Sequence, residues 1–105
     1  MANRNRTAGH NYERQIAEEL RNLGFEATTS RQESRSLDSA GVDLVTDFPL
    51  APQMKCSQNT PDIEHILNNT DAEVIFWKKV QKSSSKFMSR GEYVILRKEN
   101  FYDMF

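Results

Sequence analysis

The 105-residue chain contains a single cysteine, Cys56, and no long run of apolar residues. One cysteine excludes an internal disulfide framework and fits a reducing compartment. No segment approaches the roughly 18 consecutive apolar residues that a membrane span requires. The N-terminus also lacks the apolar region of a secretory signal. We therefore expect one cytoplasmic domain, spanning residues 1–105, with one modest core and no membrane partner.

An excess of positive charge is also missing, because the formal net charge is −1. The distribution is more informative than the sum: residues 61–73 hold four acids and no Lys or Arg, whereas residues 74–98 hold seven Lys or Arg and one acid. A second basic group near the N-terminus consists of Arg4, Arg6, Arg14 and His10. A molecule polarised in this way can hold DNA on its basic face. Solvated strand and loop ends would explain the pattern equally well.

The spacing of apolar residues predicts an α/β domain with the element order α-β-β-β-α-β-β-α. The first helix is expected from His10 to Leu23, with Gly24 at its C-terminal end. A second helix should begin at Thr60-Pro61-Asp62, where Thr60 supplies a capping hydroxyl. Strands are expected over 25–29, 42–46, 53–57, 72–80 and 91–97, in a mixed central sheet of about five strands flanked by helices.

The remaining segments are expected to be less regular. Residues 1–8 are predicted to be a mobile polar arm, residues 30–40 an exposed loop, and residues 83–86 a flexible loop or a basic hairpin tip. The last residues, 98–105, could form a helical turn. In that turn Phe101, Met104 and Phe105 should pack inward.

Asp43 is an acid within an apolar strand, and a buried carboxylate needs a cation, a metal or hydrogen-bond donors nearby. Gln53 and Lys55 are two residues apart, so on a strand their side chains share one face while Met54 points to the other. The short connection over 47–52 favours antiparallel pairing of the two strands. That pairing would bring Asp43 close to Gln53 and Lys55.

Glu13 is the fourth candidate. Ile16, Ala17 and Leu20 follow it at helical spacing on the same side, so Glu13 borders the packed stripe of the first helix, whereas Glu18 points largely away. An acid at that border can reach over the strands that the helix covers.

Each of the four residues also has a structural interpretation. Glu13 could be a surface acid, and Asp43 could be a salt-bridge partner of Lys55. Gln53 and Lys55 alone mean little, because Gln-x-Lys is common by chance. The order and spacing of all four together favour an active site.

A helix with an acid, a strand with Gly-x-Asp at Gly41–Asp43, and a strand with Gln-x-Lys at Gln53–Lys55 together resemble the PD-(D/E)xK nuclease superfamily. The small size and helix-first order most resemble archaeal-type and phage Holliday junction resolvases, over residues 9–80. Two positions depart from the pattern: Val42 stands where the motif often has Pro, and Gln53 where most relatives have Glu. The resemblance implies a small restriction-endonuclease-like fold.

The resemblance also implies a role for each residue. Asp43 would be the principal Mg²⁺ ligand, with Gln53, the Met54 backbone carbonyl and Glu13 completing the shell; Mn²⁺ is an alternative ion. The ion would polarise the scissile phosphate and activate water. Lys55 would orient that water and stabilise the developing charge. Gln53 brings no charge, so activity would depend more heavily on Asp43 and Glu13.

By the same resemblance, Ser30 and Arg31 would lie near the DNA, with Arg14 and Arg35 as phosphate contacts. The implied function is a Mg²⁺-dependent endodeoxyribonuclease of DNA recombination and repair, in a bacterial, archaeal or phage-infected host cell. It would cleave four-way junctions as a homodimer, because symmetric cleavage of two strands needs two active sites. Two alternatives stay open: a nicking or restriction-type nuclease of the superfamily, and a catalytically silent DNA-binding module.

Overall fold

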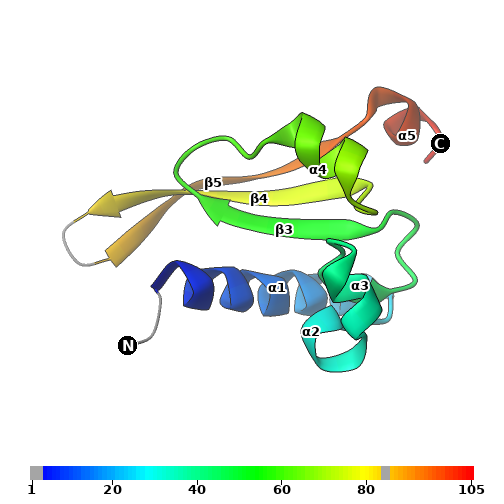
Figure 1. Cartoon of the computed structure of the whole chain (residues 1–105), viewed down its shortest axis with the longest axis horizontal. Coiled ribbons are helices and arrows are strands. Elements are labelled where there is room, and N and C mark those ends of the chain that lie inside the picture. Colours follow the sequence, from blue (N-terminus) through cyan, green and yellow to red (C-terminus); the bar gives the residue numbers. More distant parts are fainter. Residues whose placement is uncertain (1–3, 84–85) are drawn as a thin grey trace.

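The computed structural model describes residues 4–83 and 86–105 (Figure 1). Five helices and five strands follow in the order α1 (Arg4–Asn22), β1 (Ala27–Thr29), α2 (Ser30–Glu33), α3 (Arg35–Ser39), β2 (Leu44–Thr46), β3 (Pro52–Ser57), α4 (Ile63–Asn69), β4 (Val74–Ser83), β5 (Lys86–Leu96) and α5 (Lys98–Tyr102) among these residues. The α/β class is confirmed. The predicted element order is also found, with two additional short helices, α2 and α3.

The strands form two sheets instead of the single sheet that was expected. β1 pairs with β2 in an antiparallel ribbon, while β3 pairs parallel with β4, and β4 pairs antiparallel with β5. The expected ladder between the strands at 42–46 and 53–57 begins with one backbone bond, from Asp43 N to Pro52 O at 2.9 Å. It does not continue: the next donor, Met54 N, bonds the Asp43 carboxylate instead of a backbone carbonyl.

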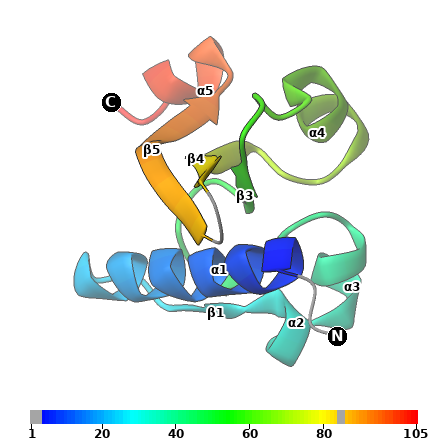
Figure 2. The ribbon, with the colours of Figure 1, turned by 90° about the vertical axis from the view of Figure 1, so that its left-hand side faces the viewer.

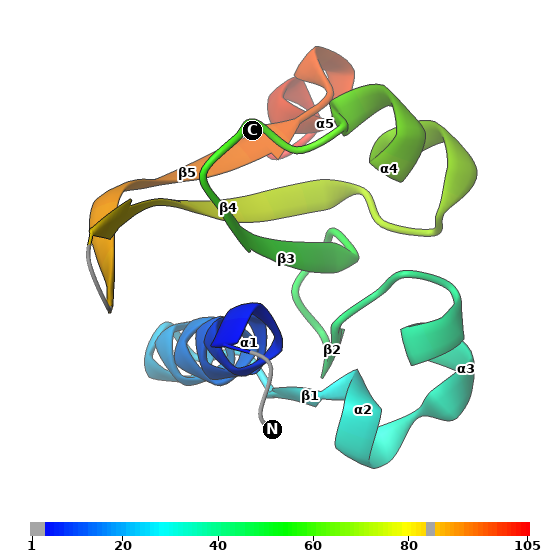
Figure 3. The ribbon, with the colours of Figure 1, turned by 60° about the vertical axis from the view of Figure 1, so that its left-hand side comes forward.

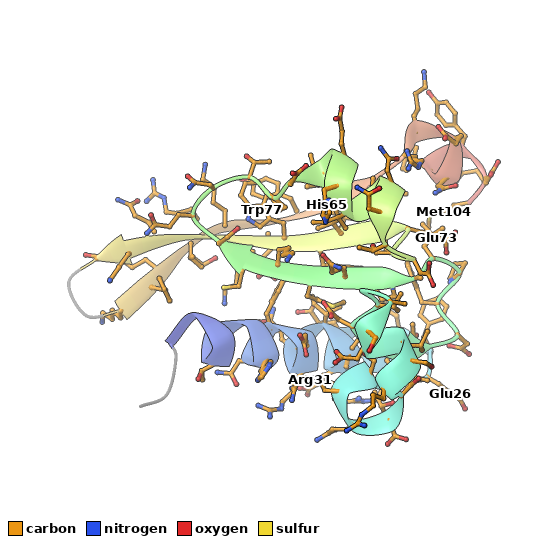
Figure 4. All side chains as sticks on the ribbon, in the orientation of Figure 1. Glu26, Arg31, His65, Glu73, Trp77 and Met104 are labelled. Carbon is orange, nitrogen blue, oxygen red and sulfur yellow. The ribbon has the colours of Figure 1, made fainter. Side chains whose placement is uncertain are left out.

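Helices cover both faces of the three-stranded sheet, as Figure 2 shows. α1 packs on one face through a core cluster with the small β1–β2 ribbon and with β3, formed by Tyr12, Ile16, Ala17, Leu20, Ala27, Leu44 and Met54. α4 packs on the opposite face through Ile66, Ala72, Ile75 and Trp77. Trp77 accordingly lies on the α4 side of β4 (Figure 4). β3 therefore runs between two cores, with one long edge turned toward β2 (Figure 3).

The first helix begins earlier than expected. Its helical hydrogen bonding starts at Arg4, so residues 4–8 of the predicted mobile arm belong to α1, and residues 1–3 lie outside the described residues. Gly24 is at the helix end, as predicted, with a φ of 101° and its N–H donating to Arg21 O. Glycine adopts that left-handed conformation without steric cost.

The segment 30–40 is not an open loop. It folds into α2 and α3, and the Ser34 side chain caps α3 by accepting a hydrogen bond from Leu37 N. Asp62, not Thr60, caps α4, because its carboxylate accepts from His65 N at 3.1 Å. α2 and α3 are four and five residues long and carry no apolar periodicity, which explains why the spacing of apolar residues did not reveal them.

The C-terminal helix forms where it was expected, but its aromatic residues do not pack inward. Phe101, Met104 and Phe105 are 46%, 48% and 91% exposed. Phe101 contacts Phe105 and Tyr102 instead of the core. β4 and β5 also extend beyond the predicted strands, to Ser83 and from Lys86, while residues 84 and 85 of the expected loop lie outside the described residues.

Among the described residues, none of the helices combines the length and the apolar character that crossing a membrane requires.

Candidate active site

Asp43 stands immediately before β2, beside the free edge of β3. Its backbone N–H donates to Pro52 O at 2.9 Å, and its carboxylate Oδ2 accepts from Met54 N at 2.8 Å. These two bonds reach β3 on either side of Gln53, so Asp43 lies next to that residue. The connection over 47–52 thus places Asp43 of the Gly-x-Asp motif against the Gln-x-Lys motif at 53–55.

Burial raises the pKa of the Asp43 carboxyl from its ordinary value of 3.8 to about 6. The Met54 hydrogen bond opposes this rise, the negative charge of Glu13 adds to it, and the positive charge of Lys55 opposes it. Both charged side chains are therefore close enough to act on Asp43. A carboxyl whose pKa is shifted upward by burial and by a second acid is typical of active sites, although ion-pair networks produce such shifts too.

Gln53 is a buried polar residue, with 8% of its surface exposed. Its Nε2 donates to Gly41 O at 2.7 Å, while its Oε1 is buried and has no hydrogen-bond partner among the described residues. A buried acceptor left without a partner costs free energy, so such an atom needs an explanation, and a bound ion is one. The orphaned oxygen is thus the atom through which Gln53 could bind a cation.

Gly41 allows this arrangement of Gln53. It has a φ of 84°, and a Cβ added to it would lie 2.7 Å from Thr70 Cβ and 3.0 Å from Gln53 Nε2. Only glycine combines that backbone conformation with so close an approach. The glycine of the Gly-x-Asp motif therefore allows the Gln53 amide to pack against the backbone at residue 41.

Met54 and Lys55 point in different directions from β3. The Met54 side chain enters the α1 core, and its backbone N–H faces the edge where Asp43 lies. On an extended strand the N–H and C=O of one residue point to the same edge, so the Met54 carbonyl also faces this edge. Lys55 is exposed and pairs in register with Trp77, on the other face of the sheet from Met54.

Glu13 approaches from α1 and is held by an ion pair. Its Oε1 accepts from Arg31 Nε at 3.1 Å, with 12% of the Glu13 side chain and 27% of the Arg31 side chain exposed. Arg31 Nη2 is buried without a hydrogen-bond partner among the described residues. Figure 4 shows Arg31 beside α1. Glu13 is therefore near Asp43, but Arg31 competes for its carboxylate.

The other predicted DNA contacts are placed less uniformly. Ser30 is fully buried, and its Oγ donates to Val42 O at 2.6 Å, so its role is to hold the start of β2. Arg14 and Arg35 are exposed, and Arg14 Nη1 donates to Asn11 Oδ1. Two of the four predicted contacts thus present their guanidinium groups to solvent.

The oxygen atoms at the β3 edge fit a Mg²⁺-type ion. Asp43 offers a carboxylate, Gln53 a buried amide oxygen, and Met54 a backbone carbonyl, and Mg²⁺ prefers such hard ligands together with water. Among residues 4–83 and 86–105, no group of three or more His, Cys, Asp or Glu side chains could hold a metal ion. The arrangement therefore suits an open site with one protein charge, not a closed protein cage.

Two features of this site lie outside the sequence motif. The Glu13–Arg31 ion pair joins residues 18 positions apart, and the contact of Gly41 with Thr70 joins residues still more distant. Arg31 was predicted as a DNA contact, so its residue type was recognised but its partner was not. The positive φ of Gly41 could have been anticipated from the Gly-x-Asp spacing, but Thr70 carries no comparable signal.

Comparison of the chain with models of known protein families, with curated proteins and with solved structures found no match.

Proposed function

We propose that the chain is a Mg²⁺-dependent endodeoxyribonuclease of the PD-(D/E)xK type that cleaves branched DNA, with four-way Holliday junctions as its substrate. The supporting observation is the environment of Asp43: a half-buried carboxylate with a raised pKa, under the influence of the charges of Lys55 and Glu13, next to Gln53 with its unpartnered Oε1. An acid whose one hydrogen bond does not offset its burial, next to an amide oxygen without a partner, is costly for a residue pair that serves packing alone.

Asp43, Gln53 and the Met54 carbonyl would hold the ion, which, when bound, polarises the scissile phosphate and activates water for attack. Lys55 places a positive charge near Asp43, where it stabilises negative charge developing on the phosphate oxygens. Glu13 holds Arg31 in place, and the Arg31 side chain, which is 27% exposed, would present part of its guanidinium group to a phosphate oxygen.

We further propose a homodimer. Exposed apolar residues in β5, in α5 and at the end of the chain support this: Val94, Phe101, Tyr102 and Phe105. Apolar surface of this kind, uncovered by the chain itself, is common where proteins associate. A second copy would also bring the second active site that paired cleavage requires.

A catalytically silent DNA-binding module is the second candidate. The Glu13–Arg31 ion pair favours it, because an acid committed to an arginine is less available to a metal. The neutral side chain of Gln53 favours it as well, since it leaves Asp43 as the one charged ligand beside Glu13.

Incubation of a labelled four-way junction with the protein and Mg²⁺ separates these functions. Paired, symmetric nicks near the branch point are the expected result, and chelation of the metal should abolish them. Cutting of linear duplex at a comparable rate would instead indicate a nicking or restriction-type nuclease. Binding of the junction without cutting, with either Mg²⁺ or Mn²⁺, would indicate the silent module.

Replacing Gln53 by Glu should preserve or raise cleavage and lower the Mg²⁺ concentration that gives half-maximal activity, because a second charge joins the ligand set. Gln53→Leu, which keeps the bulk but removes the oxygen, should raise that concentration. A Mg²⁺ titration of junction cleavage compares the three proteins. An unchanged Mg²⁺ requirement in Gln53→Leu would show that the Gln53 oxygen is not a ligand.

A further inference from the structure

The β4–β5 hairpin projects beyond the rest of the sheet. β3 ends at Ser57, which pairs with Lys79, and from Val80 onward β4 pairs with β5 alone. Figures 1 and 3 show the two strands continuing past the end of β3, with the hairpin end well away from α4 and α5. α1 lies along one face of the ribbon, at Val80, Phe87 and Ser89. Two strands covered on one face contribute little buried surface to the fold. The projection of the hairpin therefore needs another explanation.

The hairpin strands are rich in cations. Residues 74–91 contain four Lys, one Arg and no acid. Lys82, Lys86 and Arg90 lie in the projecting part, whereas Lys78 and Lys79 pair with the end of β3. Of these, Lys79, Lys82, Lys86 and Arg90 are exposed, whereas Lys78 is half-buried beside the Tyr12 ring. In the part of the chain that the structure describes, the one ion pair joins Arg31 to Glu13. Among the described residues no hairpin cation forms an ion pair, and of these cations only Lys78 stands opposite an acid, Glu92, in the register.

The cations lie on both faces of the ribbon. Lys79 and Arg90 line one hollow of about 330 Å³ together with Gln58 and Asn59. Lys78 lines a second hollow, of about 190 Å³, on the α1 side, together with Phe87. Lys82 pairs in register with Phe87, so it belongs to that second face. A flat acidic surface would meet only one of these faces.

We propose that the β4–β5 hairpin is a DNA-binding arm that enters the major groove of the duplex held at the active site. This inference rests on DNA being the substrate in the function proposed above, and it adds a surface separate from Arg14, Arg31 and Arg35. The major groove of B-DNA, about 12 Å wide, accepts a two-stranded β-ribbon, and phosphates line both of its walls. A ribbon with cations on both faces is complementary to those two walls.

The geometry of the groove distinguishes DNA from RNA. The major groove of A-form RNA is deep and narrow, so side chains of an inserted ribbon do not reach into it. An arm that only follows phosphates would bind both duplexes similarly. An arm that enters the groove should bind the DNA duplex more tightly than an RNA duplex of the same length and charge.

The test compares the full chain with a variant carrying Lys82→Gln, Lys86→Gln and Arg90→Gln, by fluorescence anisotropy with labelled DNA and RNA duplexes in EDTA. Because each lost phosphate contact lowers the slope of log K against log[salt] by about 0.9, the triple variant should lose a slope of about 2 to 3. Its affinity for DNA should fall by at least about tenfold at moderate salt. Two single variants serve as a matched pair: Lys82→Gln changes the hairpin, and Lys98→Gln changes an exposed lysine outside it. DNA affinity should fall in Lys82→Gln and stay unchanged in Lys98→Gln.

The outcomes separate the arm from the proposed function. DNA affinity and salt slope that are unchanged in the triple variant overturn the arm, whether or not the wild-type protein cleaves junctions. Equal affinity of the wild-type protein for RNA and DNA overturns entry into the groove. Loss of DNA binding in the triple variant supports the arm even if no metal ion supports cleavage, a result that would count against the nuclease alone. Circular dichroism and thermal unfolding show whether the triple variant is folded. If it is not, the single variant Lys82→Gln replaces it. A DNA affinity of Lys82→Gln equal to that of the wild-type protein then overturns the arm.

Discussion

Replacing Asp43 by Asn is expected to stabilise the protein while abolishing cleavage. The Asp43 pKa of about 6 lies above the ordinary value of 3.8, so between these values the folded state binds more protons than the unfolded state. The contribution of Asp43 to stability is therefore complete below about pH 4 and is lost as the pH rises through about 6. At pH 8 the buried charge costs on the order of 1–3 kcal/mol, which the neutral Asn avoids.

Asn is a well-matched substitution because its side-chain oxygen can still accept the hydrogen bond that Met54 N donates to Asp43. Thermal or urea unfolding at pH 4 and pH 8, in the presence of EDTA, measures the effect. The wild-type protein should lose stability between these values relative to Asp43→Asn. Asp103→Asn, a change at an exposed acid, should alter stability by less than about 0.5 kcal/mol at either pH.

Cleavage should respond in the opposite direction. Asp43 is the one charged group among the three proposed oxygen ligands, so its neutralisation should reduce the rate of junction cleavage by at least about 100-fold. Junction affinity in EDTA should change little, because the substitution removes none of the basic side chains proposed to bind phosphate. Lower stability of Asp43→Asn at pH 8, or cleavage at the wild-type rate, would argue that Asp43 is a structural residue.

Gly41→Ala should have the second large effect. A Cβ at this position would lie 2.7 Å from Thr70 Cβ and 3.0 Å from Gln53 Nε2, on a backbone with a φ of 84°. The left-handed conformation alone costs roughly 1–2 kcal/mol in a non-glycine residue. The collision with Thr70 adds to that cost, so a destabilisation of about 3 kcal/mol is expected. The Mg²⁺ requirement should also rise, because the Gln53 amide is displaced.

Gly24→Ala is the matched control for this change. Gly24 has a φ of 101°, but nothing lies within 4 Å of the Cβ that would be added. Its substitution therefore isolates the conformational cost, about 1 kcal/mol, and should leave the Mg²⁺ requirement unchanged. Equal destabilisation by the two substitutions in denaturant unfolding would mean that Thr70 and Gln53 relax without cost, and that Gly41 does not shape the site.

Periodicity predicted the elements that bury an apolar stripe. The helix that ends before Gly24 was found because its apolar residues repeat about every 3.6 residues. The strands around residues 72–80 and 91–97 were found because their residues form short, mostly apolar runs. The two helices at 30–40 were not predicted, since they are four and five residues long and carry no apolar periodicity. Splitting of the sheet could not be predicted either, because it depends on Asp43 replacing a backbone acceptor for Met54 N.

The exposure of the C-terminal aromatic residues illustrates a different limit. The apolar character of Phe101 and Phe105 predicts burial, but the partner that buries a residue need not belong to the same chain. For the candidate site, sequence spacing placed Asp43 next to Gln53, because only a short connection joins their strands. It could not predict the contacts that join remote segments, namely Arg31 with Glu13 and Thr70 with Gly41.

The most direct test of the central claim is a calorimetric titration of the DNA-free protein with Mg²⁺ at pH 8, repeated with Asp43→Asn. One ion per chain should bind to the wild-type protein, with binding that weakens as the pH falls through about 6 and is absent in Asp43→Asn, because the carboxylate must be ionised to hold the ion. Equal Mg²⁺ binding by the two proteins would contradict the account.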